Sequence, residues 1–451
     1  MYSKDKVYGI LGLARSGIAA AKKIKELGGQ AFLSDLQPAE KIKEALALQQ
    51  DFDVEFGGHT DRLLDCDEWI VSPGIPLNAP IIEKGRTKGI PMISEIEFGY
   101  QIMHPETKII AVTGSNGKST TASLIYHMLN KLDKRVILAG NIGDAFCNYD
   151  IHKSYYEYIV LEISSFQLDL IQTFKPKVAV LLNITPDHLN RYESFGHYAL
   201  SKFRLFENQG ADDFAILNTE LEAYPEQLSA LKSKALWFSQ RNSHAGIDAW
   251  VDSKFINFGA KAKVSVYDIS LRGPHNHLNM MAAVLAVNSL ERGMERVLKS
   301  INGFKPLVHR LEPVGSVNGV YFYNDSKATN TDSVRSALQS FDTPLRVIMG
   351  GSDKGEDFNC LTDILKEKAT KLYITGETSG KMRQAWLGKI PLVCLDTMAD
   401  CVKMAFDESM VGDTVLLSPG CASYDQFRNF EHRGQVFKQV VEEISWEHEK
   451  N

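Results

Sequence analysis

Short apolar segments alternate with amphipathic stretches along the first hundred residues. Apolar runs at 6–13, 30–35 and 67–76 are bounded by glycine or polar residues, and a stretch with helical spacing covers 16–27. Such runs are typical of buried strands, and strands that alternate with helices indicate β-α-β units. We therefore predict a parallel sheet with helices on both faces in this part of the chain.

Two further alternations follow. The second opens with a strand, a glycine-rich loop and a helix over 107–129, and it continues with apolar runs at 156–165 and 177–185. Short alternating strands are predicted at 249–270, and a third series of strands begins near Gly303. No short-period repeat or low-complexity linker interrupts the pattern.

The three series predict an α/β protein with three domains. The first, at 1–98, is expected to be Rossmann-like, and the second, at 99–303, to be a P-loop ATPase-like domain with a mostly parallel sheet. The third, at 304–451, is again expected to be Rossmann-like.

Composition excludes several classes of protein. The 451 residues carry 50 Lys+Arg and 56 Asp+Glu, a net charge of -6, which provides no basic field for nucleic acid. No apolar run approaches the roughly 20 residues that span a bilayer, and the start lacks a signal-peptide cleavage region. Six scattered cysteines without a CxxC pair suit a reducing compartment. We expect a cytoplasmic protein, a monomer, with no nucleic-acid partner and no membrane insertion.

The strongest chemical signal is the loop at 114–120, which reads Gly-Ser-Asn-Gly-Lys-Ser-Thr between a strand and a helix. Backbone N–H groups of such a loop point at a polyphosphate, Lys118 can reach its outer phosphates, and a hydroxyl of Ser119 or Thr120 can bind Mg²⁺. Val112 replaces the first glycine of the general motif. An ordinary glycine turn is the alternative, but the strand–loop–helix context favours an ATP or GTP site.

Polar residues follow the later strands of the central part. Glu162 ends one strand and can hold the nucleotide's metal or cap the next helix. His188 follows another strand and can bind a second Mg²⁺, although a single histidine is more often an ordinary surface residue. Lys202 lies on a helical stretch, where the pattern alone indicates a solvated face.

The N-terminal loop is an imperfect dinucleotide fingerprint. Gly12 and Gly17 have the expected spacing and Asp35 ends the next strand, but Ala14 replaces the middle glycine. A nucleotide diphosphate at this sheet edge is predicted, with Asp35 accepting a hydrogen bond from a hydroxyl. An NAD-dependent dehydrogenase is a minor alternative.

The third series ends its strands in dense polar clusters. The first cluster occupies 323–330 and contains Lys327, and it is preceded by His309 and Arg310. Lys354 follows the next strand. Cations so placed can neutralise phosphoryl charge or bind a carboxylate substrate, although each alone is more typical of a surface charge. A final cluster, Ser-Pro-Gly-Cys-Ala-Ser-Tyr-Asp, occupies 418–425 and precedes phenylalanines whose spacing is typical of core packing.

Together these segments resemble the Mur ligases. The stretches TGSNGKST, LEISSFQL, NITPDHLNR, GPHNHLN, HRLE and NDSKATN occur in the order seen in that family, over almost the whole chain. The resemblance implies an ATP-dependent amide ligase of peptidoglycan precursor synthesis, which serves cell-wall biogenesis, cell shape and division. The C-terminal stretches are similar to the branch that joins D-glutamate to UDP-N-acetylmuramoyl-L-alanine through an acyl phosphate, releasing ADP and phosphate.

The resemblance also implies roles for individual residues. Lys118, His188 and Lys202 match catalytic positions, and Lys202 matches a carbamylated lysine that helps to hold one of two magnesium ions. Metal ligands are implied at Ser119, Glu162, His188 and Lys202. ATP contacts are implied at Gly114, Ser115, Asn116, Gly117, Lys118, Ser119, Thr120, Asn276, Arg310 and Asp325. UDP-sugar contacts are implied at Ala14, Arg15, Asp35, Ser72, Gly74 and Asn141, and D-glutamate contacts at Lys327, Thr329, Lys354, Ser423 and Phe430.

Two other functions compete with this one. The first is a relative that adds another amino acid or extends a folate tail, but the chain carries no DNPR-type motif. The second is a catalytically silent scaffold that binds nucleotide. Its weakness is that a scaffold has no need for a complete set of metal and phosphate residues.

Overall fold

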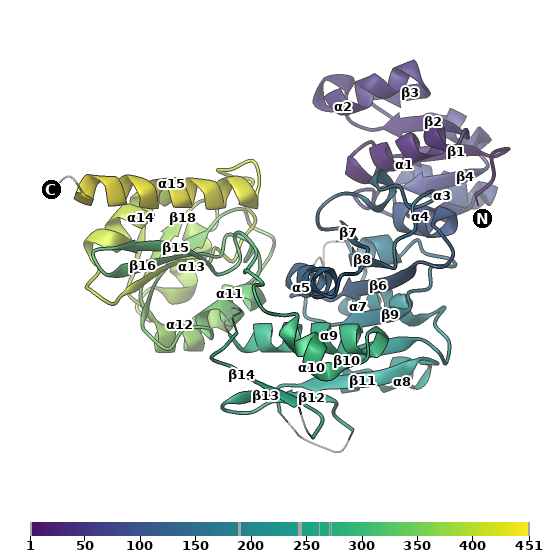
Figure 1. Ribbon diagram of the computed structural model, residues 1–451. Helices are drawn as coiled ribbons and strands as arrows, with labels where there is room; N and C mark the ends of the chain where they lie inside the picture. Colours follow the sequence, from purple (N-terminus) through teal and green to yellow (C-terminus); the bar gives the residue numbers. More distant parts are fainter. Residues whose placement is uncertain are drawn as a thin grey trace. The chain divides into compact units, whose positions relative to one another are not determined.

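The computed structural model describes residues 2–449 except 188–190, 242–245, 261, 270 and 272. It contains three sheets, each formed by one of the three predicted series (Figure 1). The mixed α/β fold class in three domains is confirmed. By contacts the chain divides into two compact units, 1–265 with 278–302, and 266–277 with 303–451. The first unit holds two sheets, and the domain boundaries at 98 and 303 stay predictions.

The first sheet is parallel with the strand order β3-β2-β1-β4-β5. Its strands are β1 (Val7–Leu11), β2 (Gln30–Asp35), β3 (Asp53–Phe56), β4 (Glu68–Val71) and β5 (Met92–Ile93), and its helices are α1 (Arg15–Glu26), α2 (Lys43–Leu46), α3 (Pro80–Lys88) and α4 (Glu95–Ile102). Short 3-10 helices are η1 (Ala39–Lys41), η2 (Ala47–Gln50) and η3 (Asp61–Asp65). The order reverses at β1, which lies between β2 and β4. Ligands of open parallel sheets bind at the carboxyl ends of strands at such a point.

The second sheet has nine strands in the order β14-β13-β12-β11-β10-β9-β6-β8-β7. Strands from β7 to β12 pair in parallel, and β12 to β14 pair antiparallel. The strands are β6 (Lys108–Thr113), β7 (Val136–Gly140), β8 (Tyr158–Glu162), β9 (Val178–Leu181), β10 (Phe214–Asn218), β11 (Lys234–Ser239), β12 (Ala249–Val251), β13 (Phe255–Phe258) and β14 (Ala262–Ser265). The α-helices are α5 (Lys118–Lys131), α6 (Ser165–Leu168), α7 (Phe195–Phe203), α8 (Pro225–Ser229), α9 (Pro274–Leu290) and α10 (Met294–Lys299), with 3-10 turns η4 (Phe146–Asn148), η5 (Arg204–Phe206) and η6 (Thr219–Ala223). Strands β6, β8 and β9 are almost wholly buried, as expected for the centre of a parallel sheet.

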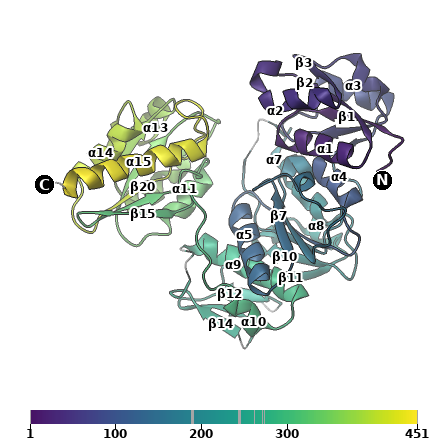
Figure 2. The ribbon, with the colours of Figure 1, turned by 45° about the horizontal axis from the view of Figure 1, so that its top comes forward.

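The third sheet has the order β15-β16-β20-β17-β18-β19, parallel except for the β15–β16 hairpin. Its strands are β15 (Glu312–Val317), β16 (Val320–Asn324), β17 (Leu345–Gly350), β18 (Ala369–Thr375), β19 (Leu392–Cys394) and β20 (Thr414–Leu417). Its helices are α11 (Thr331–Leu338), η7 (Phe358–Leu361), α12 (Thr362–Lys368), α13 (Ser379–Trp386), α14 (Met398–Asp407) and α15 (Phe430–Glu449). Helices α14 and α15 lie on the same face of this sheet (Figure 2), where Phe437 joins the core. Among the described helices, none has the length and apolar character needed to cross a membrane.

Two buried glutamates at the start of α4 differ in their surroundings. Glu97 accepts hydrogen bonds from the backbone of Gln172 and Thr173, which lowers its pKa although burial alone would raise it. Glu95 accepts one from the backbone of Cys147 at 2.6 Å, and its Oε2 has no partner among the described residues. Burial raises the pKa of Glu95 to about 7. Because the pKa of Glu97 is lowered and that of Glu95 is raised, their contributions to the stability of the fold change with pH in opposite directions.

Glu95→Gln is expected to flatten the fall in stability between about pH 4.5 and 7. The unfolded chain loses the Glu95 proton near the ordinary pKa of 4.5, whereas the folded chain keeps it to about 7. Stability therefore falls as pH rises through this window, by roughly 3 kcal/mol at most. Unfolding midpoints measured from pH 4.5 to 8 test this. Glu97→Gln is the control. Relative to the parent, this variant should be less stable at pH 7, and the difference in stability should shrink in acid. An unchanged pH dependence in Glu95→Gln would contradict the expectation.

Candidate functional site

The glycine-rich loop joins β6 to α5, as predicted. Gly117 is the N-cap of α5 with a φ of 86°, and a Cβ at this position would collide with the Asn279 side chain. Glycine is therefore required by both the backbone conformation and the space. The Lys118 ammonium donates hydrogen bonds to the carbonyl oxygens of Gly114 and Ser115, each at 2.8 Å. The Lys118 cation thus lies where the loop meets the start of a 14-residue helix. This arrangement suits a phosphate group.

The segment after β9 holds this loop in place. The Asn183 side chain accepts the backbone N–H of Asn116 at 2.9 Å and donates to the carbonyl oxygen of the same residue at 3.1 Å. The Ser115 hydroxyl donates to the carbonyl oxygen of Thr185 and accepts its N–H, both at 2.9 Å. The loop conformation is therefore set by residues almost seventy positions away.

Glu162 lies at the carboxyl end of β8, opposite Val112 of β6. It is 2% exposed; its Oε1 accepts a hydrogen bond from the Asn141 amide at 2.6 Å, and its Oε2 has no partner among the described residues. The alternative that Glu162 caps the next helix is wrong, because Ser164 caps α6 in a capping box with Gln167. A buried carboxylate oxygen left unpaired beside a phosphate loop fits the oxygen ligands that Mg²⁺ prefers.

Lys202 on α7 is 1% exposed, so the alternative of a solvated face is wrong. Its ammonium lies 3.0 Å from the carbonyl oxygen of Gly114 and 4.4 Å from the centroid of the Tyr198 ring. Burial, together with the charge of Lys118, holds the pKa of Lys202 well below its ordinary value. The neutral amine is therefore favoured. His188, the other predicted catalytic residue, lies outside the described residues.

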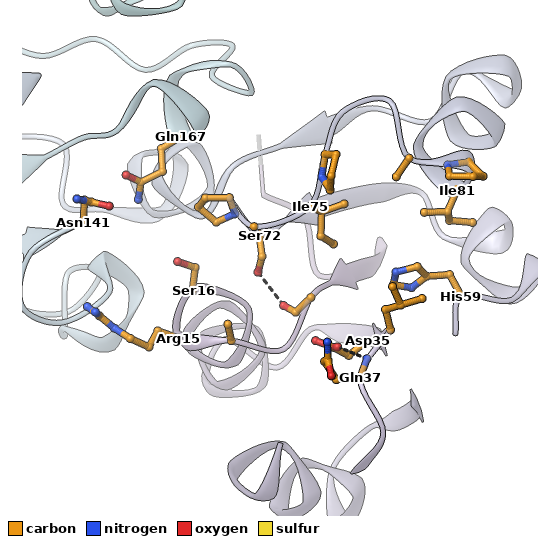
Figure 3. A pocket seen from close by; sticks show the side chains of 18 of the residues that line it. Arg15, Ser16, Asp35, Gln37, His59, Ser72, Ile75, Ile81, Asn141 and Gln167 are labelled. Atoms are coloured by element: carbon orange, nitrogen blue, oxygen red, sulfur yellow. Dashed lines mark hydrogen bonds between the residues drawn. The ribbon is translucent and has the colours of Figure 1, made fainter. Parts of the chain in front are cut away.

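All six residues predicted to contact the UDP-sugar line one cavity of about 710 Å³ in the first unit (Figure 3). They are Ala14, Arg15, Asp35, Ser72, Gly74 and Asn141. The volume lies within the range of pockets that hold small molecules. Other residues that line the cavity were not predicted, including Gln37, His59 and Gln167. Gln37 and His59 follow β2 and β3, and the half-exposed β3 has no apolar run that would have predicted it.

Short-range contacts shape the wall of this cavity. Asp35 accepts the N–H groups of Leu13 at 2.5 Å and Gln37 at 2.7 Å, so it joins the loops after β1 and β2. The Ser72 hydroxyl donates to the carbonyl oxygen of Gly12 at 2.7 Å. Among the residues that the structure describes, no side chain caps α1, which begins at the cavity. The start of that helix therefore keeps its N–H groups available for an anion.

Gly17→Ala is expected to destabilise the first unit by about 2 kcal/mol or more. A Cβ at Gly17 would collide with the carbonyl oxygen of Gly12. Gly17 is buried and the Gly12 oxygen is held by the Ser72 hydroxyl, so neither can move aside cheaply. The midpoint of thermal unfolding measures the loss. Gly380→Ala in α13 is the matched control, since a Cβ there meets nothing within 4 Å and alanine favours a helix. Equal stability of Gly17→Ala and the parent would contradict the expectation.

In the second unit, Asp325 is buried at the end of β16. Its carboxylate accepts the backbone N–H of Leu311 at 3.2 Å and the hydroxyl of Ser418 at 3.1 Å. Burial raises its pKa to about 7, although these hydrogen bonds and the charge of Arg310 oppose the rise. Asp325 thus ties together three segments that the sequence separates. Asn276 and Arg310, predicted with it as ATP contacts, belong to the same unit.

The structure brings some of the predicted D-glutamate residues together. The Lys327 ammonium lies over the ring of Phe430, 3.7 Å from its centroid. Ser423 is buried and Thr329 is half-buried. Lys354 is exposed, two residues after Ser352, which forms a bridge with Ala422. Phe430 therefore contacts a cation, whereas the later Phe437 packs in the core as its spacing indicated.

Arg433 is a residue that sequence analysis missed. It is 2% exposed, and its guanidinium donates to Ser326 and to the carbonyl oxygens of Cys421 and Ala422 at 2.8–3.1 Å. It thereby joins the two polar clusters that follow β16 and β20. Burial lowers its pKa to about 10. An arginine on a helix usually marks a solvated face, so no local signal could reveal this role.

Comparison with known proteins finds one family throughout. Residues 8–80 match the MurD N-terminal domain, 112–287 the Mur ligase middle domain, and 309–421 the Mur ligase glutamate ligase domain. The chain is 39% identical to a UDP-N-acetylmuramoylalanine--D-glutamate ligase of Koribacter versatilis, covering 98% of both chains. It is 41% identical to the protein of the same name from Cytophaga hutchinsonii, covering 97% of this chain and 98% of that one.

Solved structures share the fold. The UDP-N-acetylmuramate-alanine ligase MurC of Thermotoga maritima superposes with a TM-score of 0.62 at 17% identity, covering 97% of this chain and 99% of that one. The MurF ligase of the same organism, in complex with ADP, superposes with a TM-score of 0.63 at 15% identity, covering 92% and 95% of the two chains.

Proposed function

The chain belongs to the Mur ligase family, and we propose that it joins D-glutamate to UDP-N-acetylmuramoyl-L-alanine at the expense of ATP, in peptidoglycan precursor synthesis. The phosphate loop with Lys118 folded over it is the observation that carries this function. Relatives at 36–41% identity, over nearly the whole chain, are named for the same reaction. An NAD-dependent dehydrogenase would leave this loop without a role.

The reaction proceeds in two steps. The terminal carboxylate of the L-alanine attacks the γ-phosphorus of ATP, ADP leaves, and an acyl phosphate forms. The amine of D-glutamate then attacks the acyl carbon, and the tetrahedral intermediate collapses to the amide and inorganic phosphate. Lys118 exchanges its carbonyl partners for the outer phosphates and neutralises charge as it moves to the acceptor. The start of α5 supports the same phosphates with its N–H groups.

Glu162 and Ser119 are the residues that would hold the first magnesium ion. The unpaired Oε2 of Glu162 supports this assignment, and Ser119 is buried in the first turn of α5. When bound, the ion supplies positive charge to the phosphate oxygens. Asn141 holds the Glu162 side chain in place with its amide.

Lys202 would act as a carbamate. A neutral buried amine can add to CO₂, forming an N–C bond and releasing one proton, so that a neutral group is replaced by an anion. The lowered pKa of Lys202 supports this because only the neutral amine is nucleophilic. The anion would attract the Lys118 ammonium, and its oxygens together with His188 would hold a second magnesium ion.

The two organic substrates bind at the two other groups of predicted residues, one in each unit. The cavity of the first unit receives the UDP-sugar, with Arg15 and the uncapped start of α1 facing the diphosphate. In the second unit, Lys327 and Lys354 are the cations for the two carboxylates of D-glutamate, and Thr329, Ser423 and Phe430 complete the pocket. Phe430 already positions the Lys327 ammonium over its ring.

Phosphate release from ATP tests this function directly. The purified chain is given UDP-N-acetylmuramoyl-L-alanine and one amino acid at a time, and phosphate is measured. Turnover only with D-glutamate is the expected result. Turnover with another amino acid would keep the ligase chemistry and overturn the specificity. Binding of ATP without turnover in any mixture would favour a silent scaffold.

A further inference from the structure

The UDP-sugar cavity has two chemically different sides. Figure 3 shows Arg15 and Asn141 at one side and His59 and Ile81 at the other. The first side has a guanidinium and the start of a helix, which suit phosphates. The second combines apolar side chains such as Ile75 and Ile81 with a few polar groups, which suits a planar base. On the proposed function, this second side receives the uracil.

The His59 ring is fixed by a buried serine. Its Nδ1 lies 2.7 Å from the Ser34 hydroxyl oxygen. The single hydroxyl proton of Ser34 is donated elsewhere, to Glu55 Oε1 at 2.5 Å, with the carbonyl oxygen of Gly58 as a second acceptor at 3.4 Å. Since Ser34 has no further proton to give, its oxygen must accept from His59, and the ring carries its hydrogen on Nδ1.

Glu55 holds the hydroxyl in this orientation. Its carboxylate also accepts the N–H of Thr60 at 3.0 Å and the hydroxyl of the same residue at 2.6 Å. Burial alone would raise the pKa of Glu55, but the hydrogen bonds from Ser34 and Thr60 outweigh it and keep the carboxylate ionised. The opposite tautomer of His59 would need the Ser34 proton and would break the shortest of these bonds.

The other ring nitrogen, Nε2, is therefore a hydrogen-bond acceptor, and its ring lines the cavity. Within the described part of the chain, no group is hydrogen-bonded to it. Burial lowers the pKa of His59, against the charges of Glu55 and Asp35, so the ring is neutral at pH 7. Asp35, the second acidic group whose charge acts on the ring, already accepts from Leu13 and Gln37.

We infer that His59 determines base specificity by accepting a hydrogen bond from the N3–H of the uracil. Uracil has a donor at N3, whereas cytosine has a lone pair there, which would face the lone pair of Nε2. A site built to pair with a polar group rejects an analogue that cannot pair, because both partners then stay desolvated and unsatisfied. The role of His59 in substrate choice rests on the proposed function.

Equilibrium binding of three free nucleotides to the full chain tests the role of His59. The nucleotides are UDP, CDP and the diphosphate of N3-methyluridine. The parent is expected to bind UDP at least about tenfold more tightly than the other two. His59→Asn keeps a donor near Ser34 but loses the acceptor at the Nε2 position, so UDP binding should weaken about five- to tenfold while CDP binding hardly changes. His104→Asn, on the same unit but outside the cavity, is the matched control.

A second variant tests the tautomer lock without removing the ring. Ser34→Ala frees the imidazole to place its hydrogen on either nitrogen, so the preference for UDP over CDP should shrink, chiefly through tighter CDP binding. An unchanged ratio of UDP to CDP affinity in both His59→Asn and Ser34→Ala would overturn the inference. A parent chain with no preference for UDP would overturn it as well.

Turnover separates this inference from the proposed function. If D-glutamate-dependent phosphate release is present, His59→Asn should raise KM for the UDP-sugar and leave kcat and the KM for ATP unchanged. Activity with an unaltered base preference would remove His59 from substrate choice and leave the ligase intact. Loss of the UDP preference in His59→Asn, in a chain that shows no ligase activity, would support His59 and overturn the proposed function.

Discussion

Lys118→Ala is expected to lower kcat by about a thousandfold or more. The Lys118 ammonium lies on the carbonyl oxygens of Gly114 and Ser115, so it is already at the loop that receives the phosphates. Alanine removes this cation from the outer phosphates at the stage where negative charge moves to the acceptor. The effect should fall on the chemical step more than on ATP binding, because the backbone N–H groups of the loop remain.

Single-turnover phosphate release and ATP binding, measured on the same preparations, test this. Lys131→Ala is the matched control, since Lys131 is exposed at the other end of α5. It makes the same lysine-to-alanine change in the same helix, away from the phosphate loop. Lys118→Met adds a variant that keeps the length of the side chain without its charge. A rate for Lys118→Ala within a few fold of the parent would remove this lysine from the mechanism.

Lys202→Ala is expected to lose activity by about a hundredfold or more, and added short carboxylic acids are expected to restore part of it. The side chain fills a buried site beside Gly114 and Tyr198, so alanine leaves a space that formate or acetate can enter. Their carboxylate oxygens then replace those of the carbamate. Removal of CO₂ should lower the activity of the parent, and bicarbonate should restore it.

Two variants serve as controls for this rescue. Lys118→Ala should not respond to the same acids, because it lacks a cation rather than an anion. Lys202→Arg should be inactive and unresponsive, since the guanidinium fills the space and cannot form a carbamate. Failure of every acid to restore Lys202→Ala, at concentrations that leave the parent active, would contradict a carbamate at this position.

Much of the order of strands and helices could be predicted from the sequence alone. Apolar runs of strand length, glycine turns and helical spacing are local signals, and they recur from Val7 to Leu417. The phosphate loop could be predicted for the same reason, because its strand, glycines, lysine and helix are contiguous. Strands β3, β5, β7, β10, β11 and β15 were not predicted. In β3 the charged residues at the sheet edge form no apolar run.

The surroundings of each polar side chain depended on packing between distant segments. Lys202 carries a helical signal typical of solvent, yet it is buried against Gly114, 88 residues away. From the sequence, Glu162 could hold a metal or cap the next helix, and the structure shows that Ser164 caps that helix. The role of Arg433 could not be predicted from the sequence around it, because its hydrogen-bond partners Ser326 and Cys421 follow two other strands.

The sequence by itself thus determined the fold class, the family resemblance and the position of the phosphate loop, all of which depend on residues close together in the chain. Only the tertiary structure decided that Glu162 has an unpaired oxygen, that Lys202 is buried, and that Ser34 orients the ring of His59. The physical reason is that burial and hydrogen bonding of a polar group are set by whichever segments pack around it. In this chain those segments come from different strands of the sheets.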